Sequence, residues 1–600
     1  MELLCYTRKP LEDILYANRL AFSMHLALRD QKKGRFVPLH HNEGIVYAEA
    51  VSREDGTLCA KSLRSPWLFE TGNGWGVVAV RTEAEGEDDP ESEGCILLFD
   101  TEDLVHYTEK GLFRLQEKGY IQQVRCVYEK EKNVYLLCWQ REDGSWMKGE
   151  AHLFEETGLA TGAATAMDGS CVEGDVPSSD ETMEIEGAVP GNAVEIPEEA
   201  GKYLKNKLTA PVCVGMRLSS QGPFASEEEL RQVRAIASYS DGSEVVRTVD
   251  WEFPAGADGL VRGRVHQAHF DFPFAEYRAD PCCMYRDGKY YFIATNDADH
   301  NHTLYMRCSP TLEGIVAAEE KLFLDSETYP DVKGLLWAPE FHTINGKLYM
   351  FHAATPSEFY WQVSRVRELK EGGDPMCKED WSEPRPVLKK DGSRLTEGGK
   401  VISLDMTVIP YEGKYYVMWS QRQYVPVDQG AWLYIAQIDE KEPWKLVTDP
   451  VCIKKPEYGW ENNHTFVVEG PYRLEMENEI FIAYSGALID ATYTIGLLKL
   501  KKGKDILDPK SWEKIGYPLQ SSRSAEGEYG TGHNSFLQDT DGLVWNFYHG
   551  KKGINGPRSS GARRVHFDVD GEPMLDVTED RDLPEEFRFV EAKLSGPAGK

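Results

Sequence analysis

One two-strand unit recurs five times in the second half of the chain, and this repetition predicts an all-β protein containing a five-bladed β-propeller. In each copy a tight turn precedes a strand rich in aromatic and β-branched residues, as in Asp287-Gly-Lys-Tyr-Tyr-Phe-Ile-Ala-Thr295. The turns carry Gly or Asn, residues that tolerate positive φ in a hairpin. They lie at Gly288, Gly346, Gly413, Asn478 and Gly542, which are 58 to 67 residues apart. Self-similarity at such a spacing is typical of propellers.

Five ionisable residues lie six to nine positions before these turns, near the end of the preceding strand. They are Asp280, Glu340, Asp405, Glu469 and His533. In a propeller the strand before such a hairpin is the innermost strand of its blade, so we expect the five side chains to converge on the central axis. Several carboxylates in one place are unfavourable unless some are protonated, hydrogen-bonded or paired with a cation. The pattern therefore predicts a functional site at the axis.

The remaining segments predict a propeller-like β-domain and a small immunoglobulin-like β-sandwich insert before the propeller. Strand-like runs indicate the first domain, and an acidic stretch rich in Gly, Ala, Ser and Thr indicates a linker or long loop. Alternating residues around Asp241-Gly242 indicate the immunoglobulin-like module. The expected parts are a partial propeller-like domain over 1–154, an acidic linker over 155–204, the module over 205–260, the five-bladed propeller over 261–585 and a C-terminal tail over 586–600.

The charge of the chain excludes some classes of partner. The sequence has 99 acidic and 67 basic residues, a formal net charge of −32. Such an acidic surface argues against binding to nucleic acid and to anionic membranes. It suits a protein whose substrate is neutral.

Three observations predict a cytoplasmic location. Residues Met1 to Pro10 lack the basic start and apolar run of a signal peptide. The sequence has no run of about 18 apolar residues, so no membrane span is expected. Twelve cysteines are scattered without a metal-like cluster, a usage typical of reduced thiols.

The five axis motifs together resemble the signatures of glycoside hydrolase family 43. The motifs are Arg278-Ala-Asp-Pro281, Trp337-Ala-Pro-Glu340, Ser403-Leu-Asp-Met-Thr407, Val468-Glu-Gly-Pro471 and Gly532-His-Asn-Ser535. The resemblance extends over about 265–575 and includes all five blades in order. It implies a five-bladed propeller and an inverting hydrolase that acts on arabinofuranosides or xylosides.

The resemblance also implies a role for each of three carboxyl groups. Asp280 resembles the general base, Glu469 the general acid and Asp405 the third carboxylate. An inverting glycosidase needs an ionised carboxylate to deprotonate water and a protonated one to assist the leaving oxygen. The negative charge of Asp405 would raise the pKa of Glu469, and Asp405 would also orient that side chain.

Seven further residues are expected to bind substrate around these carboxyl groups. Arg278 and Arg564 are candidates for ion pairs that keep the base ionised. Aromatic side chains beside the motifs could form a platform on which a sugar ring stacks, and Glu340 is expected to hydrogen-bond the fold or the substrate. The seven residues are Arg278, Trp337, Glu340, Phe341, Tyr472, His533 and Arg564.

His533 resembles the family histidine near the axis, which in some members helps to hold a calcium or other ion through water. The sequence therefore allows a structural calcium ion at the axis, although no cofactor is expected to be required. A histidine is a poor direct ligand for Ca²⁺, which prefers oxygen. A hydrogen-bonding role for His533 without metal is the alternative.

Three segments indicate the substrate. Ile293–Asp299, Trp419–Gln423 and Tyr458–Asn462 look most like the α-L-arabinofuranosidases of the family, although β-xylosidases share the carboxylates. A cytoplasmic location favours an exo-acting enzyme that removes terminal α-L-arabinofuranosyl residues from small oligosaccharides derived from arabinan or arabinoxylan. A β-D-xylosidase or a bifunctional enzyme is the first alternative. A propeller glycoside phosphorylase and a non-catalytic sugar-binding protein are more distant ones.

Overall fold

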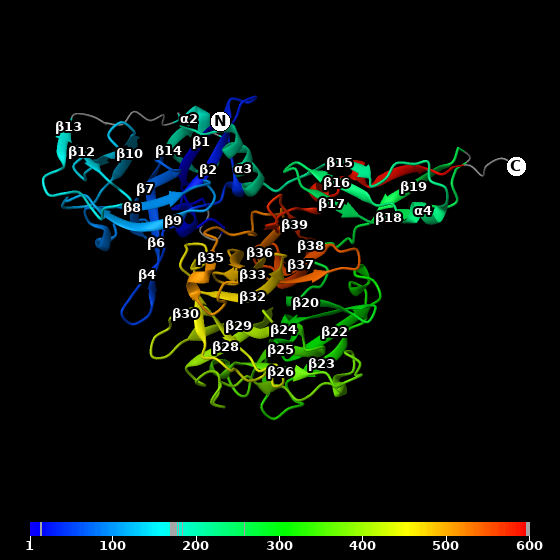
Figure 1. Ribbon diagram of the computed structural model, residues 1–600. Coiled ribbons are helices and arrows are strands. Elements are labelled where there is room, and N and C mark those ends of the chain that lie inside the picture. Colours follow the sequence, from blue (N-terminus) through cyan, green and yellow to red (C-terminus); the bar gives the residue numbers. More distant parts are fainter. Residues whose placement is uncertain (12–14, 168–176, 178, 183, 257, 596–600) are drawn as a thin grey trace.

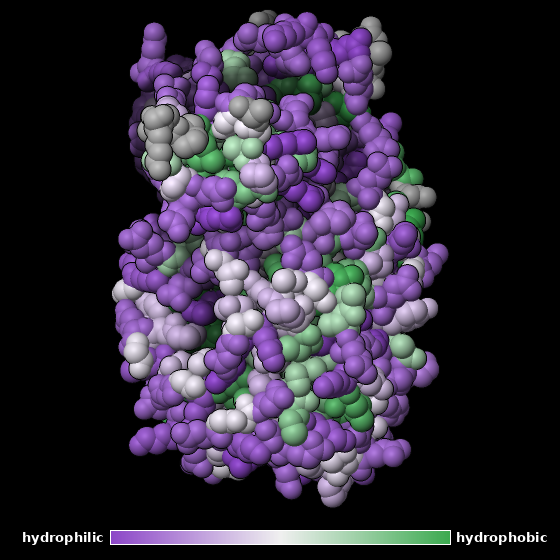
Figure 2. Space-filling view, turned by 90° about the vertical axis from the view of Figure 1, so that its right-hand side faces the viewer, coloured by the Kyte–Doolittle hydropathy of each residue, from purple (hydrophilic) through white to green (hydrophobic). Residues whose placement is uncertain are grey.

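The computed structural model describes residues 1–600 except 12–14, 168–176, 178, 183, 257 and 596–600. The prediction of an all-β protein is confirmed, because strands form nearly all of the regular structure. Figure 1 separates an N-terminal region, a small module and a larger body below them. The face in Figure 2 is largely hydrophilic, as the net charge of −32 leads us to expect. None of the described helices is long and apolar enough to cross a membrane.

Five antiparallel sheets form the larger body, which we call the five-sheet region. In each sheet the hydrogen-bonded neighbours follow in sequence order, and we call the strand that comes first in the sequence the first strand. The sheets are β20 (Arg278–Arg286), β21 (Lys289–Asn296), β22 (Thr303–Ser309) and β23 (Lys321–Asp325); β24 (Gly334–Ile344), β25 (Lys347–Thr355), β26 (Val363–Glu368) and β27 (Arg385–Pro386); β28 (Val401–Tyr411), β29 (Lys414–Gln423), β30 (Gly430–Gln437) and β31 (Val451–Lys454); β32 (Val468–Glu475), β33 (Glu479–Gly486), β34 (Thr494–Lys501) and β35 (Trp512–Lys514); and β36 (Glu528–Gln538), β37 (Val544–Lys552) and β38 (Arg558–Arg564). The first strands contact one another in a cycle, β20 to β24, β28, β32, β36 and back to β20.

A bulge interrupts the pairing of each first strand at the position of its motif. In every bulge one residue has left-handed backbone geometry, with φ between 46° and 56°. These residues are Asp280, Ala338, Asp405, Gly470 and His533. A bulge adds an unpaired residue and re-aims its side chain. In three of the sheets the distortion turns the side chain of Asp280, Asp405 or His533 into the pocket at the centre of the cycle, and in the fourth sheet the residue before the bulge glycine, Glu469, lies there.

Three further sheets form the N-terminal region, and they contact one another through β1, β6, β10 and β14. They are β14 (Ala188–Glu195), β1 (Glu2–Arg8), β2 (His25–Asp30) and β3 (Arg35–Pro38); β6 (Lys61–Glu70), β7 (Trp75–Glu83), β8 (Cys95–Thr101) and β9 (Thr108–Arg114); and β10 (Gln123–Glu129), β11 (Val134–Gln140), β12 (Trp146–Ala151) and β13 (Thr165–Met167). β6 carries a similar bulge, with Ser65 at φ 52°. The N-terminal sheet thus shares the local distortion but has a serine at the position that Asp280, Asp405 and His533 occupy in three sheets of the five-sheet region.

Two hydrophobic cores join the N-terminal region to the five-sheet region. One core combines residues such as Leu26 and Leu97 with Leu474 and Phe481 of the fourth sheet. The other packs Tyr16, Leu20, Ala21 and Tyr47 against side chains of the third and fourth sheets. Burial of these apolar surfaces is favourable at about 25 cal/mol per Å², so the two regions stabilise each other.

The predicted linker over 155–204 differs from the structure in its second half. β14 pairs antiparallel with β1, and the helix α3 (Glu198–Leu208) follows it. Pro190 and Gly191 are unusual in a strand, so the sequence of β14 does not indicate one. Its partner β1 is also far away in the sequence, at the start of the N-terminal region. Much of the acidic Gly- and Ala-rich part lies outside the described residues.

The small module consists of two three-stranded sheets with a shared hydrophobic core. Its strands are β15 (Cys213–Leu218), β16 (Ala235–Tyr239) and β17 (Glu244–Arg247), and β18 (Val249–Trp251), β19 (Leu260–Val265) and β41 (Phe589–Lys593). β41 lies within the predicted C-terminal tail over 586–600, yet it pairs with β19 and buries Ala592. The sequence did not indicate this pairing, because more than 300 residues separate the two strands.

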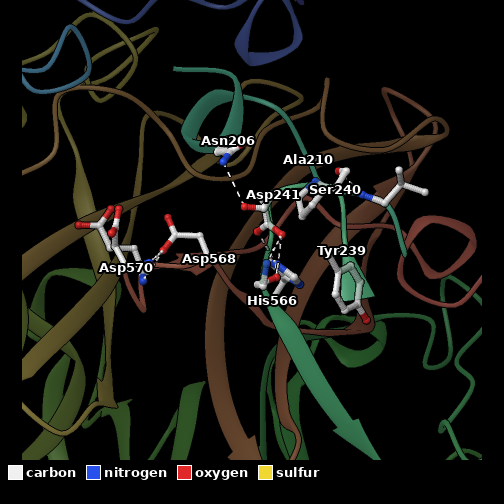
Figure 3. Close-up of polar contacts among 12 residues, drawn as sticks. Asn206, Ala210, Tyr239, Ser240, Asp241, His566, Asp568 and Asp570 are labelled. Carbon is white, nitrogen blue, oxygen red and sulfur yellow. Dashed lines mark hydrogen bonds and ion pairs between the residues drawn. The ribbon is translucent and has the colours of Figure 1, made fainter. Parts of the chain in front are cut away.

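Short strand pairs and α-helices complete these parts, apart from several single-turn 3-10 helices. They are the hairpin β4 (Val51–Ser52) and β5 (Leu58–Cys59), the pair β39 (His566–Phe567) and β40 (Pro573–Met574), and the helices α1 (Asn18–Ala21), α2 (Ser179–Thr182), α4 (Glu227–Arg231) and α5 (Glu579–Asp582). Figure 3 shows one such joint, where Asn206 and His566 meet Asp241 of the module. Asn206 Nδ2 donates to the Asp241 carbonyl oxygen at 3.1 Å, and His566 Nε2 lies 2.9 Å from Asp241 Oδ2.

A buried ion cluster fastens the module to the last sheet. Asp582 accepts hydrogen bonds from Arg247 of β17, at 2.8 Å, and from Arg564 of β38, at 2.9 Å. Tyr239 also donates its hydroxyl proton to Asp582, at 2.8 Å. Burial alone would raise the pKa of Asp582, but the charges of Arg564 and Arg247 outweigh this and lower it. The carboxylate is therefore ionised in the folded protein at neutral pH.

We expect Asp582→Asn to reduce the free energy of unfolding by about 3–5 kcal/mol, because it leaves two buried guanidinium groups without their anion. Thermal or urea denaturation measures this loss. Because the folded pKa of Asp582 is depressed, its contribution is present above the ordinary aspartate value of about 3.9 and is lost as the pH falls below it. Asp580→Asn, an exposed position in the same short helix, is the control and should change stability by less than about 0.5 kcal/mol. Equal stability of the two variants would contradict the role of the cluster.

Candidate active site

A pocket of about 350 Å³ lies where the five bulges meet. Its lining includes five of the predicted site residues, Asp280, Trp337, Asp405, Glu469 and His533. Two larger cavities, of about 730 and 860 Å³, lie among the other parts of the chain. Neither is lined by Asp280, Asp405, Glu469 or His533, so the smaller pocket is the candidate active site.

Asp280 is buried, with 5% of its surface exposed, and is surrounded by hydrogen-bond donors. Thr295 donates its hydroxyl proton to Oδ2 at 2.6 Å, and Arg558 Nη1 lies 3.3 Å from Oδ1. His533 Nδ1 and His549 Nδ1 lie 3.2 and 3.1 Å from Oδ1. Burial alone would raise the pKa of Asp280, but His533, Arg558 and His549 together hold it well below the usual range. Asp280 is the anion of the pocket.

Glu469 and Asp405 are in the opposite situation. Burial raises the pKa of Glu469, and the negative charge of Asp280 raises it further. Burial and the negative charges of Glu469 and Asp280 also raise the pKa of Asp405. Tyr493 donates its hydroxyl proton to Glu469 Oε1 at 2.8 Å, and the backbone N–H of Gly470 donates to Asp405 Oδ2 at 3.0 Å. A carboxyl group with a raised pKa retains its proton and can act as an acid.

His533 links the carboxylates rather than forming a clear metal centre. Its Nδ1 lies 3.2 Å from Asp280 and 4.0 Å from Asp405. Among the described residues, no three or more His, Cys, Asp or Glu side chains are grouped so that they could hold a metal. A calcium ion held through water near His533, which the resemblance allows, stays a prediction.

Glu340 does not line the pocket. The bulge residue of its sheet is Ala338, so Glu340 occupies a different position from Asp280 and Asp405. It is buried, and its Oε2 lies 2.7 Å from His342 Nε2. Burial raises the pKa of Glu340 well above its usual value and lowers that of His342 to about 3. A neutral buried pair of this kind suits a structural role. The shorter spacing before its turn, six residues rather than eight or nine, was the signal in the sequence.

Four other predicted substrate contacts also lie away from the pocket. Phe341 is buried in a hydrophobic core, against which Tyr472 packs. Arg278 pairs with Glu320 at 2.6 Å and donates to Asn296, and Arg564 belongs to the Asp582 cluster. Successive side chains of a strand point to opposite faces, so Phe341, next to Glu340, faces a sheet interior. Arg564 lies at the far end of β38, away from the motifs. Trp337 alone of the predicted aromatic residues lines the pocket.

Three polar residues around the carboxyl groups were not predicted from the sequence. Arg558 pairs with both Asp280 and Asp297, and Tyr493 holds Glu469. The ring of His549 stacks on Tyr493, with 5.4 Å between centroids and 3° between planes. Burial lowers the pKa of His549 to about 4. None of the three lies in a first-strand motif; they come from β37, β38 and the segment before β34. Only the fold brings them to the axis.

Aromatic side chains surround the open side of the pocket. Trp337 and Phe359 meet edge to face at 5.8 Å, and Phe359 meets Tyr424 at 5.9 Å. Tyr360, 47% exposed, contacts Tyr424 at 5.0 Å. Arg422 lies over the Tyr424 ring, 4.8 Å from its centroid. The pocket therefore combines a carboxyl group of lowered pKa and two of raised pKa at its base with an aromatic mouth, an arrangement suited to acid–base chemistry on a sugar.

The comparison with known proteins agrees with this site. A protein of Streptomyces chartreusis named "Extracellular exo-alpha-(1->5)-L-arabinofuranosidase" is 31% identical over 293 residues, 48% of this chain and 85% of that protein. A protein of the same name from Streptomyces avermitilis is 31% identical over 321 residues, 51% of this chain and 63% of that protein. The crystal structure of an α-L-arabinofuranosidase from Lactobacillus brevis is 29% identical, with a TM-score of 0.45, and covers 50% of this chain and 95% of that one.

The names of the two Streptomyces relatives contradict the predicted cytoplasmic location, because both are extracellular enzymes. That prediction was wrong. The prediction depended on the composition of the first ten residues, the lack of a long apolar run and the scattered cysteines.

The matched part of the chain coincides with the five sheets that form the site. Residues 270–573 match the model of the glycosyl hydrolases family 43. This range begins before β20, ends after β38 and includes Asp280, Asp405, Glu469 and His533. The chain belongs to glycosyl hydrolase family 43.

Proposed function

We propose that this chain is an exo-acting, inverting α-L-arabinofuranosidase. The observation that carries the proposal is the opposite pKa shift of two carboxyl groups in one pocket, lowered for Asp280 and raised for Glu469. The curated relatives support the substrate, because four proteins that match about half of this chain are named arabinofuranosidases.

In the proposed reaction the ionised Asp280 removes a proton from water while the water oxygen bonds to the anomeric carbon. The bond from this carbon to the leaving oxygen breaks, and Glu469 gives that oxygen its proton. Attack opposite the leaving group inverts the anomeric configuration. The negative charge that helps to keep the acid protonated comes from Asp280. Asp405, whose own pKa is raised, accepts a hydrogen bond from the Gly470 backbone N–H beside Glu469 and so orients that strand. Arg558 and the two histidines keep the base ionised.

We also infer that the five sheets are the blades of a five-bladed propeller. The cyclic contacts of the first strands and the repeated bulge support this arrangement. The three N-terminal sheets, with their similar bulge at Ser65, support the predicted partial propeller-like domain.

The arrangement of charge disfavours the phosphorylase alternative. Both arginines of the pocket are already paired, Arg558 with Asp280 and Asp297, and Arg422 with Asp428. No cation is left without a carboxylate among the described pocket residues, whereas a phosphate co-substrate needs a basic site.

The decisive measurement is proton NMR of the anomeric signal during hydrolysis of p-nitrophenyl α-L-arabinofuranoside, with the β-D-xyloside measured in parallel. We expect immediate appearance of β-arabinose from the α-arabinofuranoside and slow or no turnover of the xyloside. Faster turnover of the xyloside would favour a β-xylosidase. Retained configuration would contradict the roles of Asp280 and Glu469.

Two substitutions separate the acid from the base. Glu469→Gln should lower kcat for poor leaving groups by about 10²–10⁴-fold and affect p-nitrophenyl substrates much less, because only the former need a proton. Asp280→Asn should be inactive with both, since water still needs a base. Hydrolysis rates with alkyl and nitrophenyl arabinofuranosides test this pattern. Equal losses for both leaving groups in Glu469→Gln would remove Glu469 from the role of acid.

Arg558→Met should raise the pKa of Asp280, because a positive charge that holds it low is lost. The base then takes up a proton at higher pH, so the acidic limb of the profile of kcat/KM against pH moves upward by about one pH unit. Arg558→Lys is the control, since it keeps the charge and should leave the limb nearer its original place. If the acidic limb of the profile does not move in Arg558→Met, Arg558 does not control the pKa of Asp280.

A further inference from the structure

One wall of the pocket is held from outside by the N-terminal region. We use the term pocket wall for two segments, 422–431 and 456–467, which contribute Arg422, Tyr424, Ala431, Thr465 and Val467 to the lining. The two segments are joined by the backbone N–H of Ala431, which donates to the Phe466 carbonyl oxygen at 2.9 Å. Displacement of either segment therefore moves the other.

The tip of the hairpin β4–β5 contacts the first segment. Gln429 donates its side-chain N–H to the carbonyl oxygen of Asp55 at 3.0 Å. The next residue, Gly56, has φ +82°, and a Cβ placed there would lie 2.3 Å from Gln429 Nε2. No side chain other than hydrogen fits between the hairpin and Gln429 without movement.

Gln429 is coupled to the lining residues through short contacts. Its backbone N–H donates to the Gln423 carbonyl oxygen at 3.0 Å. The neighbouring Asp428 accepts from Arg422 at 2.7 Å and from the Gly430 N–H at 3.0 Å. Arg422 in turn lies over Tyr424. A shift of Gln429 thus reaches two side chains of the pocket within one or two contacts.

The N-terminal region also holds the second segment. Arg19 Nη1 donates to the Asn462 carbonyl oxygen at 2.6 Å and to its side-chain oxygen at 3.2 Å. The backbone N–H of Ala50, just before β4, donates to the Glu457 carbonyl oxygen at 2.8 Å. Both segments of the wall are therefore attached to residues 19–56, and these residues pack on the third and fourth sheets through Leu20 and Tyr47.

The pocket wall lies on the side where the leaving group must sit. Val467 and Glu469, the proposed acid, belong to the same strand end, and Tyr424 contacts the exposed Phe359 and Tyr360 at the mouth. In an exo-acting enzyme the terminal sugar fills the base of the pocket, and the rest of the substrate remains at the mouth near the acid.

We propose that the hairpin tip at Asp55-Gly56 is a positioning element for the leaving-group side of the active site, acting through Gln429 on Arg422 and Tyr424. The N-terminal region then sets how well the enzyme binds the oligosaccharide beyond the terminal sugar. This inference rests on the proposed function for its substrate, but the contact itself does not.

A second hairpin in the chain provides a matched control. Residues 53–57 read Arg-Glu-Asp-Gly-Thr and residues 141–145 read Arg-Glu-Asp-Gly-Ser. Gly56 and Gly144 both have φ +82°, and in both turns the aspartate accepts from the hydroxyl residue after the glycine. A Cβ on Gly144 would meet nothing within 4 Å. Gly56→Ala and Gly144→Ala therefore carry the same backbone strain, and only Gly56→Ala displaces Gln429.

The test compares these variants in the full chain. Gly56→Ala should lower kcat/KM for arabino-oligosaccharides about tenfold, mainly through KM, because small misplacements of binding groups have large effects. The p-nitrophenyl arabinofuranoside should change by less than about twofold. Gly144→Ala should match the wild type with both. Hydrogen exchange of the amides in 422–431 should quicken in Gly56→Ala alone.

A double variant tests whether Gly56→Ala acts on the pocket through Gln429. In a Gln429→Ala background the side chain that meets the new methyl group is gone, so Gly56→Ala should have no further effect on KM. An unchanged KM and unchanged amide exchange in Gly56→Ala would overturn the inference. So would an equal effect of Gly56→Ala with and without Gln429. Failure of the wild type to hydrolyse arabinofuranosides would instead contradict the proposed function, and the exchange measurement would still decide whether the hairpin positions the wall.

Discussion

Three carboxyl groups share one buried pocket, and the repulsion between them is the constraint that the surrounding residues must resolve. The chain resolves it by giving the groups unlike neighbours. Asp280 receives Arg558, two imidazoles and a hydroxyl donor, and so remains an anion. Glu469 and Asp405 receive few positive neighbours, so burial favours their neutral forms. The asymmetry needed for acid–base chemistry thus comes from neighbours in other strands.

The backbone contributes to the same result through a repeated distortion. A bulge in every first strand places one residue in the left-handed region, and three of these residues are Asp280, Asp405 and His533. Non-glycine residues adopt this conformation at a cost of about 1–3 kcal/mol each. The packing of five adjacent sheets maintains it. The sequence motifs therefore mark the positions where a bulge in the backbone directs side chains into the pocket.

Much of this was predictable from the sequence, for a physical reason. Turns and alternating strands are encoded locally, so the five hairpins and the bulge residues Asp280, Asp405 and His533 could be located without a structure. Arg558 and Tyr493 could not, because nothing in their local sequence indicates that they reach the axis. The same limit applies to β14 and β41, each paired with a strand far away in the chain. For Glu340 the local sequence was misleading. Its motif resembles the others, but Glu340 lies two residues after the bulge residue Ala338, and its side chain lies in the protein interior.

The hydrophobic core that combines N-terminal leucines with Leu474, Phe481 and Leu497 of the fourth sheet bears on how the protein can be divided. A fragment beginning near residue 261 would retain every proposed catalytic side chain, but it would expose the apolar surface on which the N-terminal region rests. Exposed apolar surface of this kind promotes aggregation. We therefore expect that the segment matched by the family model does not remain soluble without the N-terminal region. Shorter family members need a different, more polar surface at the same place, and grafting the N-terminal region onto one of them would require that surface to be rebuilt.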